Sequence, residues 1–257
     1  MENNSPAQIP TMPLVSLEKA YQYMQSLEYS DAEGIMFLEQ QLYNLLTTNP
    51  EDSNFLALLL HEQIMNNRGQ RARSIAYKIW ENGGINNPNI ELMYINDLIN
   101  LCMLDMAGAA LAPSIADLEN ADENTSKLLL KYAIISGNMT LLARLVQYLP
   151  DNKNTKILED WLSMSDYLQA NNHIPNIMKR ITDKVKDSVL SFSYKLYSDR
   201  EFPEVEFIFY VGSEINNHND LQQRLNMDIS SYCASHKIQD LINLSNLILP
   251  INRYQQD

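Results

Sequence analysis

The chain has 257 residues, of which 45% are apolar and 20% charged, and it contains only 7 glycines and 10 prolines. This length corresponds to one or two domains or one elongated repeat array; the apolar fraction excludes wholesale disorder, and so few glycines argue against a sandwich or barrel. The 32 acids outweigh the 19 lysines and arginines, and the resulting net charge of −13 argues against nucleic-acid binding and favours a basic protein as partner.

The two ends of the chain and its cysteines indicate no export, membrane or redox role. Residues 1–13 are polar and acidic with three prolines, and they lack the basic start and apolar stretch of a secretory signal. Cys102 and Cys233 form no CxxC motif, which favours two buried free thiols. We expect a cytoplasmic protein with a flexible N-terminal tail at 1–13, a single helical repeat domain over 14–250 and a C-terminal tail at 251–257.

Residues 14–88 predict two helical hairpins. Helical apolar spacing is interrupted by a turn near Tyr29–Asp31, and Asp31 is the expected N-cap of the helix that follows. The second hairpin, over 55–79, turns at 66–69. Each hairpin ends at an Asn-Pro pair, because proline disfavours the helical conformation of the residue before it.

The same alternation of apolar helical faces and short turns predicts further hairpins along the rest of the chain. They cover 90–118, 128–149, 157–185, 189–211 and 221–249. The turns within the seven hairpins fall near residues 31, 67, 107, 137, 171, 199 and 235. The distances between successive turns are close to the roughly 34-residue period of a helix-turn-helix solenoid. The predicted fold is therefore all-α, an α-solenoid of about seven antiparallel helical hairpins.

Glu201–Gly212 is the segment with the most ambiguous pattern. Val205, Phe207 and Phe209 alternate with other residues, as in a strand. Pro203 suits the first turn of a helix, and the neighbouring segments have helical spacing. Helix is the expectation here, and strand is the alternative.

The pattern over 49–88 resembles the tetratricopeptide repeat. Asn49-Pro50 and Asn87-Pro88 resemble the Asp-Pro that closes such repeats. Leu59 and Ala72 fall where that family places a leucine in the first helix and an alanine in the second.

Two positions depart from the repeat pattern. Leu60 stands where the family has a small residue, and Gln63 stands where it has an aromatic one. The resemblance implies a right-handed superhelix that binds peptides or protein segments and has no catalytic activity. It implies no individual ligand-contacting residues, because the matching positions are packing positions.

No motif for catalysis, a cofactor or a metal ion stands out. His61-Glu62 begins like a zincin motif, but Met65 stands where the second histidine is required. His173, His218 and His236 lie in or near predicted turns without a carboxylate or cysteine at ligand spacing. Nucleophile-elbow, P-loop and dinucleotide fingerprints do not occur. We predict no enzymatic activity, no cofactor and no metal site.

Charge and side-chain type indicate candidate interaction surfaces in the middle of the chain. Residues 79–126 contain eight acids and no lysine or arginine, which would steer a basic partner. Arginines and a lysine gather around the turn at 66–69 and could bind an acidic group. Methionines cluster beside Tyr94 and could bind apolar side chains. The predicted partner-binding residues are Glu91, Tyr94, Asp97, Asn100, Asp105, Arg68 and Arg71.

The expected function is that of a non-catalytic scaffold or adaptor, which binds a segment of a partner protein through a helical-repeat groove with an acidic central face. An alternative is a regulatory inhibitor or chaperone that masks the basic nucleic-acid-binding or effector-binding surface of its partner. A helical-repeat enzyme with a cryptic site is a third hypothesis. Neither direct nucleic-acid binding nor membrane binding is expected, and the sequence leaves a homodimer open.

Overall fold

The computed structural model describes residues 14, 16–28, 30–198, 203–212, 215, 217–238 and 244–250. They form two compact units, one made by the residues up to Asp97 and the other by those from Leu98 onward. Most of these residues are helical, and a small three-stranded sheet is the exception. The predicted tails lie outside the described residues, and the single domain expected over 14–250 stays a prediction.

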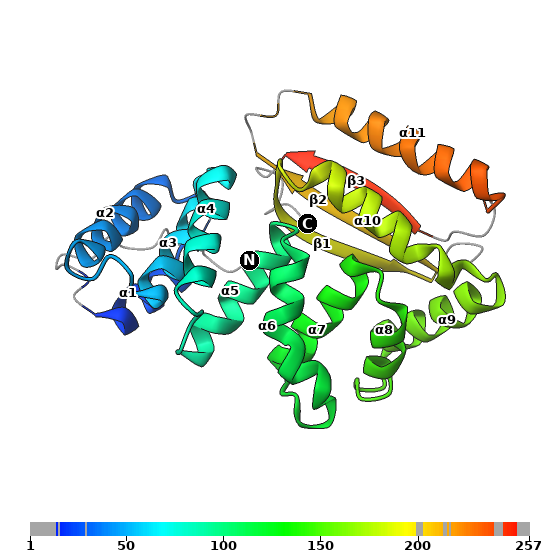
Figure 1. Ribbon diagram of the computed structural model, residues 1–257, viewed down its shortest axis with the longest axis horizontal. Coiled ribbons are helices and arrows are strands. Elements are labelled where there is room, and N and C mark those ends of the chain that lie inside the picture. Colours follow the sequence, from blue (N-terminus) through cyan, green and yellow to red (C-terminus); the bar gives the residue numbers. More distant parts are fainter. Residues whose placement is uncertain are drawn as a thin grey trace, which may run out of the picture. The chain divides into compact units, whose positions relative to one another are not determined.

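The first unit is a set of helices packed around a central one (Figure 1). It contains α1 (Leu17–Gln25), α2 (Ala32–Thr48), α3 (Ser53–Met65), α4 (Gly69–Glu81) and α5 (Pro88–Asn100) as far as Asp97. The Asp31 carboxylate accepts a hydrogen bond from the N–H of Gly34, so the predicted N-cap of α2 is confirmed. Helix α3 is buried on nearly all sides because α1, α2 and α4 pack against it.

The second unit continues with helices and ends in a sheet (Figure 1). Its helices are α6 (Leu104–Ala116), η1 (Leu118–Asn120), α7 (Glu123–Ser136), α8 (Met139–Val146), α9 (Lys153–Tyr167), η2 (Ala170–Asn172), α10 (Ile174–Val185) and α11 (His218–His236). Gly137 ends α7 in the left-handed conformation, with φ of 65°. The connections predicted near residues 137 and 171 are therefore confirmed.

The turn predicted at Met106–Gly108 is wrong, because this segment lies inside α6. The chain turns earlier, between α5 and α6, where Cys102 has φ of 56°. A Cβ at position 108 would overlap the hydroxyl of Tyr132. The glycine therefore allows a close approach between α6 and α7 and does not mark a turn.

The sheet consists of β1 (Val189–Tyr197), β2 (Glu204–Val211) and β3 (Leu244–Pro250), in the order β1-β2-β3. β1 and β2 pair in antiparallel fashion, and β2 and β3 pair in parallel. Helix α11 makes the crossover between the two parallel strands and packs against β3 and α10. This arrangement is a β-hairpin followed by a βαβ unit.

The sheet corrects the helical predictions for the last two hairpins. The strand alternative is confirmed for Glu204–Val211, and the helices predicted over 189–197 and 238–249 are wrong in their described parts. Phe192 lies opposite Phe209 on the neighbouring strand, with ring centroids 5.3 Å apart. Such aromatic cross-strand pairs stabilise a sheet, and they outweigh the helical pattern of the preceding chain.

Candidate functional site

Three of the predicted binding residues are buried and make internal hydrogen bonds. Tyr94 is 3% exposed, and its hydroxyl donates to a backbone carbonyl of α4 at 3.1 Å. Asp97 is fully buried, with its carboxylate 3.0 Å from Nδ1 of His61. In the second unit, the Oδ1 of Asn100 accepts a hydrogen bond from the N–H of Phe192 at 3.3 Å. These three side chains support the packing of their helices and are not presented on a surface.

The two predicted arginines are exposed and pair with groups of the first unit. Arg68 Nη1 lies 2.5 Å from a carboxylate oxygen of Glu39 on α2, and Arg71 Nη1 lies 3.8 Å from the same oxygen. The guanidinium of Arg71 also lies over the ring of Tyr43, 5.3 Å from its centroid. The arginines thus act as counter-charges between α2 and α4. Glu91 and Asp105 are exposed, and their role in binding stays a prediction.

Part of the acidic stretch forms the start of a helix. The Asp122 carboxylate accepts a hydrogen bond from the N–H of Thr125 at 2.7 Å, which lowers the pKa of this carboxyl below its ordinary value. Glu123 lies 2.6 Å from Lys127, and this hydrogen-bonded ion pair lowers its pKa as well. Both acids lie in the cap and first turn of α7, where the helix dipole favours negative charge.

The described residues contain no group of three or more His, Cys, Asp and Glu side chains that could hold a metal ion. Inside the first unit, the half-buried His61 instead pairs with the buried Asp97, and the buried Glu62 pairs with Asn66. In the same described parts of the chain, no helix combines the length and apolar character needed to cross a membrane.

A pocket of about 990 Å³, with polar and apolar lining in similar shares, lies in the second unit between α8 and α9. Its first wall comes from α8, which begins directly after the Gly137 turn and is capped by Asn138. Leu141, Leu142 and Leu145 of α8 are buried. The opposite stripe of the helix therefore faces the pocket, with side chains at helical spacing. These side chains are Thr140, Ala143, Arg144 and Gln147.

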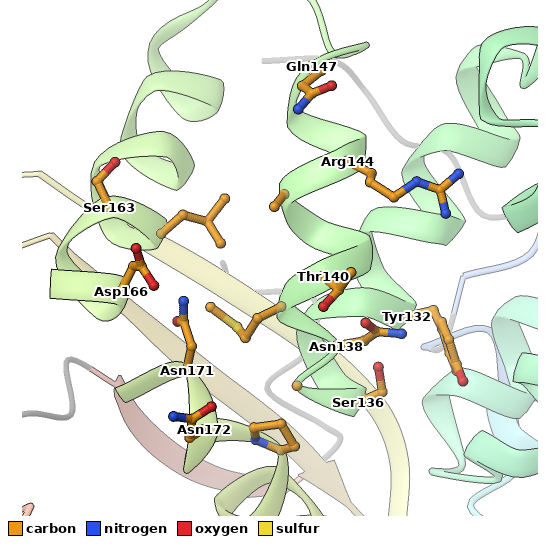
Figure 2. Close-up of a pocket in the computed structure, with 15 residues that line it drawn as sticks. Tyr132, Ser136, Asn138, Thr140, Arg144, Gln147, Ser163, Asp166, Asn171 and Asn172 are labelled. Atoms are coloured by element: carbon orange, nitrogen blue, oxygen red, sulfur yellow. The ribbon is translucent and has the colours of Figure 1, made fainter. Parts of the chain in front are cut away.

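The second wall comes from α9 and the short η2 turn that follows it. Leu162, Ser163 and Asp166 of α9 line the pocket, and η2 adds Asn171 and Asn172. The buried side of α9, which includes Trp161 and Ser165, fixes the rotation of the helix and turns the lining residues outward. In Figure 2, side chains from both walls surround the space between the helices.

The charges of the pocket are few and lie apart. Among the residues that line it, Arg144 carries the only positive charge and Asp166 the only negative one. Asp166 and Asn171 lie on the α9 side, whereas Arg144 extends from α8 away from them (Figure 2). Nη2 of Arg144 donates to the carbonyl of Ile115 at 3.3 Å. The remaining polar lining consists of amides and hydroxyls.

One amide of the pocket has an unmet acceptor. The Oδ1 atom of Asn171 is buried and has no hydrogen-bond partner among the described residues. A buried acceptor without a partner costs about 1–3 kcal/mol. Side-chain amides both donate and accept, which suits the alternating N–H and C=O groups of a peptide main chain. The described residues that line the pocket include no histidine or cysteine.

The sequence analysis missed this pocket, although one signal for it was present. Asn138 and Asn171 lie in turns of successive hairpins, 33 residues apart. Turns at one repeat period lie on the same side of a helical array, so their polar side chains can converge. Asp166 gave no such signal, because one acid in a helix is usually a solvated residue.

No protein-family model matches the chain, and no curated protein or solved structure matches it either.

Proposed function

We propose that this chain is a non-catalytic interaction protein, a scaffold or adaptor that binds a segment of a partner protein in the pocket between α8 and α9. The single observation that carries the proposal is the set of amides and hydroxyls in this pocket, beside apolar lining surface of similar extent. Amides and hydroxyls come from two successive helical hairpins, and the Asn171 oxygen has no partner among the described residues. A segment bound there would meet hydrogen-bonding groups on both walls and the apolar Leu162 between them.

We further propose that the helices from α1 to α10 are successive repeats of the tetratricopeptide type. The helices from α1 to α10 follow one another in the chain, and the pairs α1–α2, α3–α4 and α7–α8 are in contact. In such an array each repeat packs on its neighbours, and the grooves between repeats accept partner segments. The pocket then corresponds to the groove between the fourth and fifth pairs.

The experiment that tests the binding function is selection from a random peptide library displayed on phage, with the full chain as bait. The variant Ala143→Trp places a large side chain in the pocket from an exposed position of α8. We expect selected peptides to bind this variant about tenfold or more weakly than the unchanged protein, because the added indole occupies the site.

The matched control is Ala112→Trp, which changes another exposed helical alanine that does not line the pocket. The control should bind the selected peptides with unchanged affinity. Equal affinity of the unchanged protein and Ala143→Trp for every selected peptide would contradict the proposed function, provided that both are folded by circular dichroism.

A further inference from the structure

A second pocket lies on the other side of α9. Its volume is about 440 Å³, and it is bounded by α9, by Ser198 directly after β1 and by Pro203 before β2. Met164 and Tyr167 line it from α9, and Tyr167 is 83% exposed. An aromatic side chain this exposed is available to stack on a ligand.

The two pockets meet at one residue. Ser163 lines both of them, and its side chain is exposed on the outer surface of α9. Because the serine side chain is short, it leaves room for a bound segment to pass over α9 between the two pockets. A segment in the first pocket can therefore continue over α9 into the second.

Each pocket has one carboxylate at this crossing. Asp166 lines the first pocket and Asp160 lines the second, and both are exposed. Neither lies within ion-pair distance of a lysine or arginine in the described part of the chain. Among the described residues that line the second pocket none is positively charged, and Arg144 on the far side of the first pocket is the one described cation that lines either. The crossing therefore favours a positively charged ligand.

The spacing of the two carboxylates sets the form of that ligand. Asp160 and Asp166 are six residues apart on one helix, which places their Cα atoms about 10 Å apart. A polyproline II segment rises about 3.1 Å per residue with three residues per turn, so its residues i and i+3 share one face about 9 Å apart. The two aspartates also lie about 120° apart around the helix, so two long basic side chains with this backbone separation would spread to reach both carboxylates.

We infer that the partner segment is an extended, basic stretch of polypeptide that crosses α9 at Ser163, with one cationic side chain at Asp166 and another, three positions away, at Asp160. The Tyr167 ring stacks on the segment where it enters the second pocket. This inference rests on the proposed function and adds the chemistry and the path of the bound segment.

The test uses fluorescein-labelled peptides of about twelve residues, titrated against the full chain by fluorescence anisotropy at about 0.15 M salt. The probes contain Arg-Pro-Pro-Arg, adjacent arginines, or Glu-Pro-Pro-Glu in a common serine and threonine background. The Arg-Pro-Pro-Arg peptide should bind most tightly, and its affinity should fall as salt rises. Asp160→Lys and Asp166→Lys should each weaken it about tenfold.

Glu159→Lys is the matched control, because Glu159 is an exposed acid of the same helix that lines neither pocket. Its affinity for the peptide should stay within about twofold of the unchanged protein, since only long-range attraction is lost. An effect of Glu159→Lys equal to that of Asp160→Lys would overturn the inference, as would equal binding of the acidic peptide.

The outcomes separate this inference from the proposed function. Binding that is lost in Ala143→Trp and kept in Asp160→Lys overturns the path across α9 and supports the proposed function. If both variants retain binding of the basic peptide, the inference is overturned, and the proposed function is overturned as well only when the library-selected peptides also bind Ala143→Trp with unchanged affinity. If none of the arginine-containing peptides shows saturable binding, only the inference is overturned. The proposed function is tested separately, with the peptides selected from the random library.

Discussion

Glu62 shows how a polar residue can be kept in the centre of a helical unit. Its side chain is fully buried on α3 and accepts hydrogen bonds from the amides of Gln63 and Asn66. Burial, together with the nearby carboxylate of Glu39, raises the pKa of Glu62 to about 7. The folded protein therefore holds a proton on this group at pH values where the unfolded chain has lost it.

This raised pKa predicts a pH-dependent stability. Because the folded-state pKa lies above the ordinary 4.5, the stabilisation is complete at low pH and is lost as pH rises through the window from 4.5 to about 7. Glu62→Gln keeps the shape of the side chain and removes its titration. The free energy of unfolding should therefore fall less with rising pH in this variant, by on the order of 2 kcal/mol. Urea unfolding of both proteins at a series of pH values measures the difference. Parallel pH profiles would contradict the prediction.

His61, the neighbour of Glu62, adds a second contribution at higher pH. Burial lowers the pKa of its imidazole, but the charge of Asp97, the hydrogen bond to it and, to a smaller extent, the charge of Glu62 outweigh burial and raise the pKa above 6.5. A raised histidine pKa gives stabilisation that is present below 6.5 and lost as pH rises through the folded-state value. The Glu62→Gln variant should therefore retain a fall in stability above pH 6.5, and His61→Gln should remove that remaining part when urea unfolding is repeated.

Single residues also explain why the chain departs from the tetratricopeptide pattern at certain positions. Gln63 occupies a position at which an aromatic was expected, and its amide donates to Glu39 as well as to Glu62. A pattern of residue types cannot reveal such a network, because the partner on α2 lies 24 positions earlier. Tyr94, Asp97 and Asn100 were predicted on a surface for the same reason, since their buried partners lie elsewhere in the sequence.

At the scale of the elements, the helices up to α10 were predictable and the sheet was not. The apolar faces of α2 and α8 repeat at helical spacing, and the turn at Gly137 has a residue suited to positive φ. In β1, Phe192 and Tyr194 alternate with serines, but a strand is stable only when its partners are present. The βαβ pairing of β2 with β3 depends on segments more than 30 residues apart, which local spacing does not show.

The β3 edge is covered by a side chain, which leads to a further prediction. The Gln222 amide of α11 donates to the carbonyl of Asn246 at 3.1 Å and accepts from the N–H of Ile248 at 2.6 Å. It thus occupies backbone groups that an added strand would use. Gln222→Leu should lower the free energy of unfolding by about 1–3 kcal/mol, because both backbone groups lose their partner.

The same variant should also self-associate, because the uncovered edge can pair with a strand of another copy. Sedimentation velocity at rising protein concentration measures this association. The control is Gln223→Leu, at an exposed neighbouring position of α11. Association of both variants to the same extent would show that added apolar surface is responsible and that the edge is not.

At the scale of the whole molecule, the net charge of −13 and the pocket chemistry favour the same kind of partner. In our proposal the charge would attract a basic segment from a distance and raise its rate of association, whereas Asp160 and Asp166 would set its position at α9. The sequence alone predicted a basic partner but placed it on acids between residues 79 and 126. The pocket could not be located from the sequence, because it requires the relative placement of α8 and α9.

The central claim is that a partner segment occupies the pocket between α8 and α9. The most direct test is hydrogen-deuterium exchange of the full chain, measured by mass spectrometry with and without a library-selected peptide. We predict slower exchange in residues 136–147 and 159–175, because these segments form the two walls. Protection confined to residues 16–97, with unchanged exchange in both walls, would contradict the account.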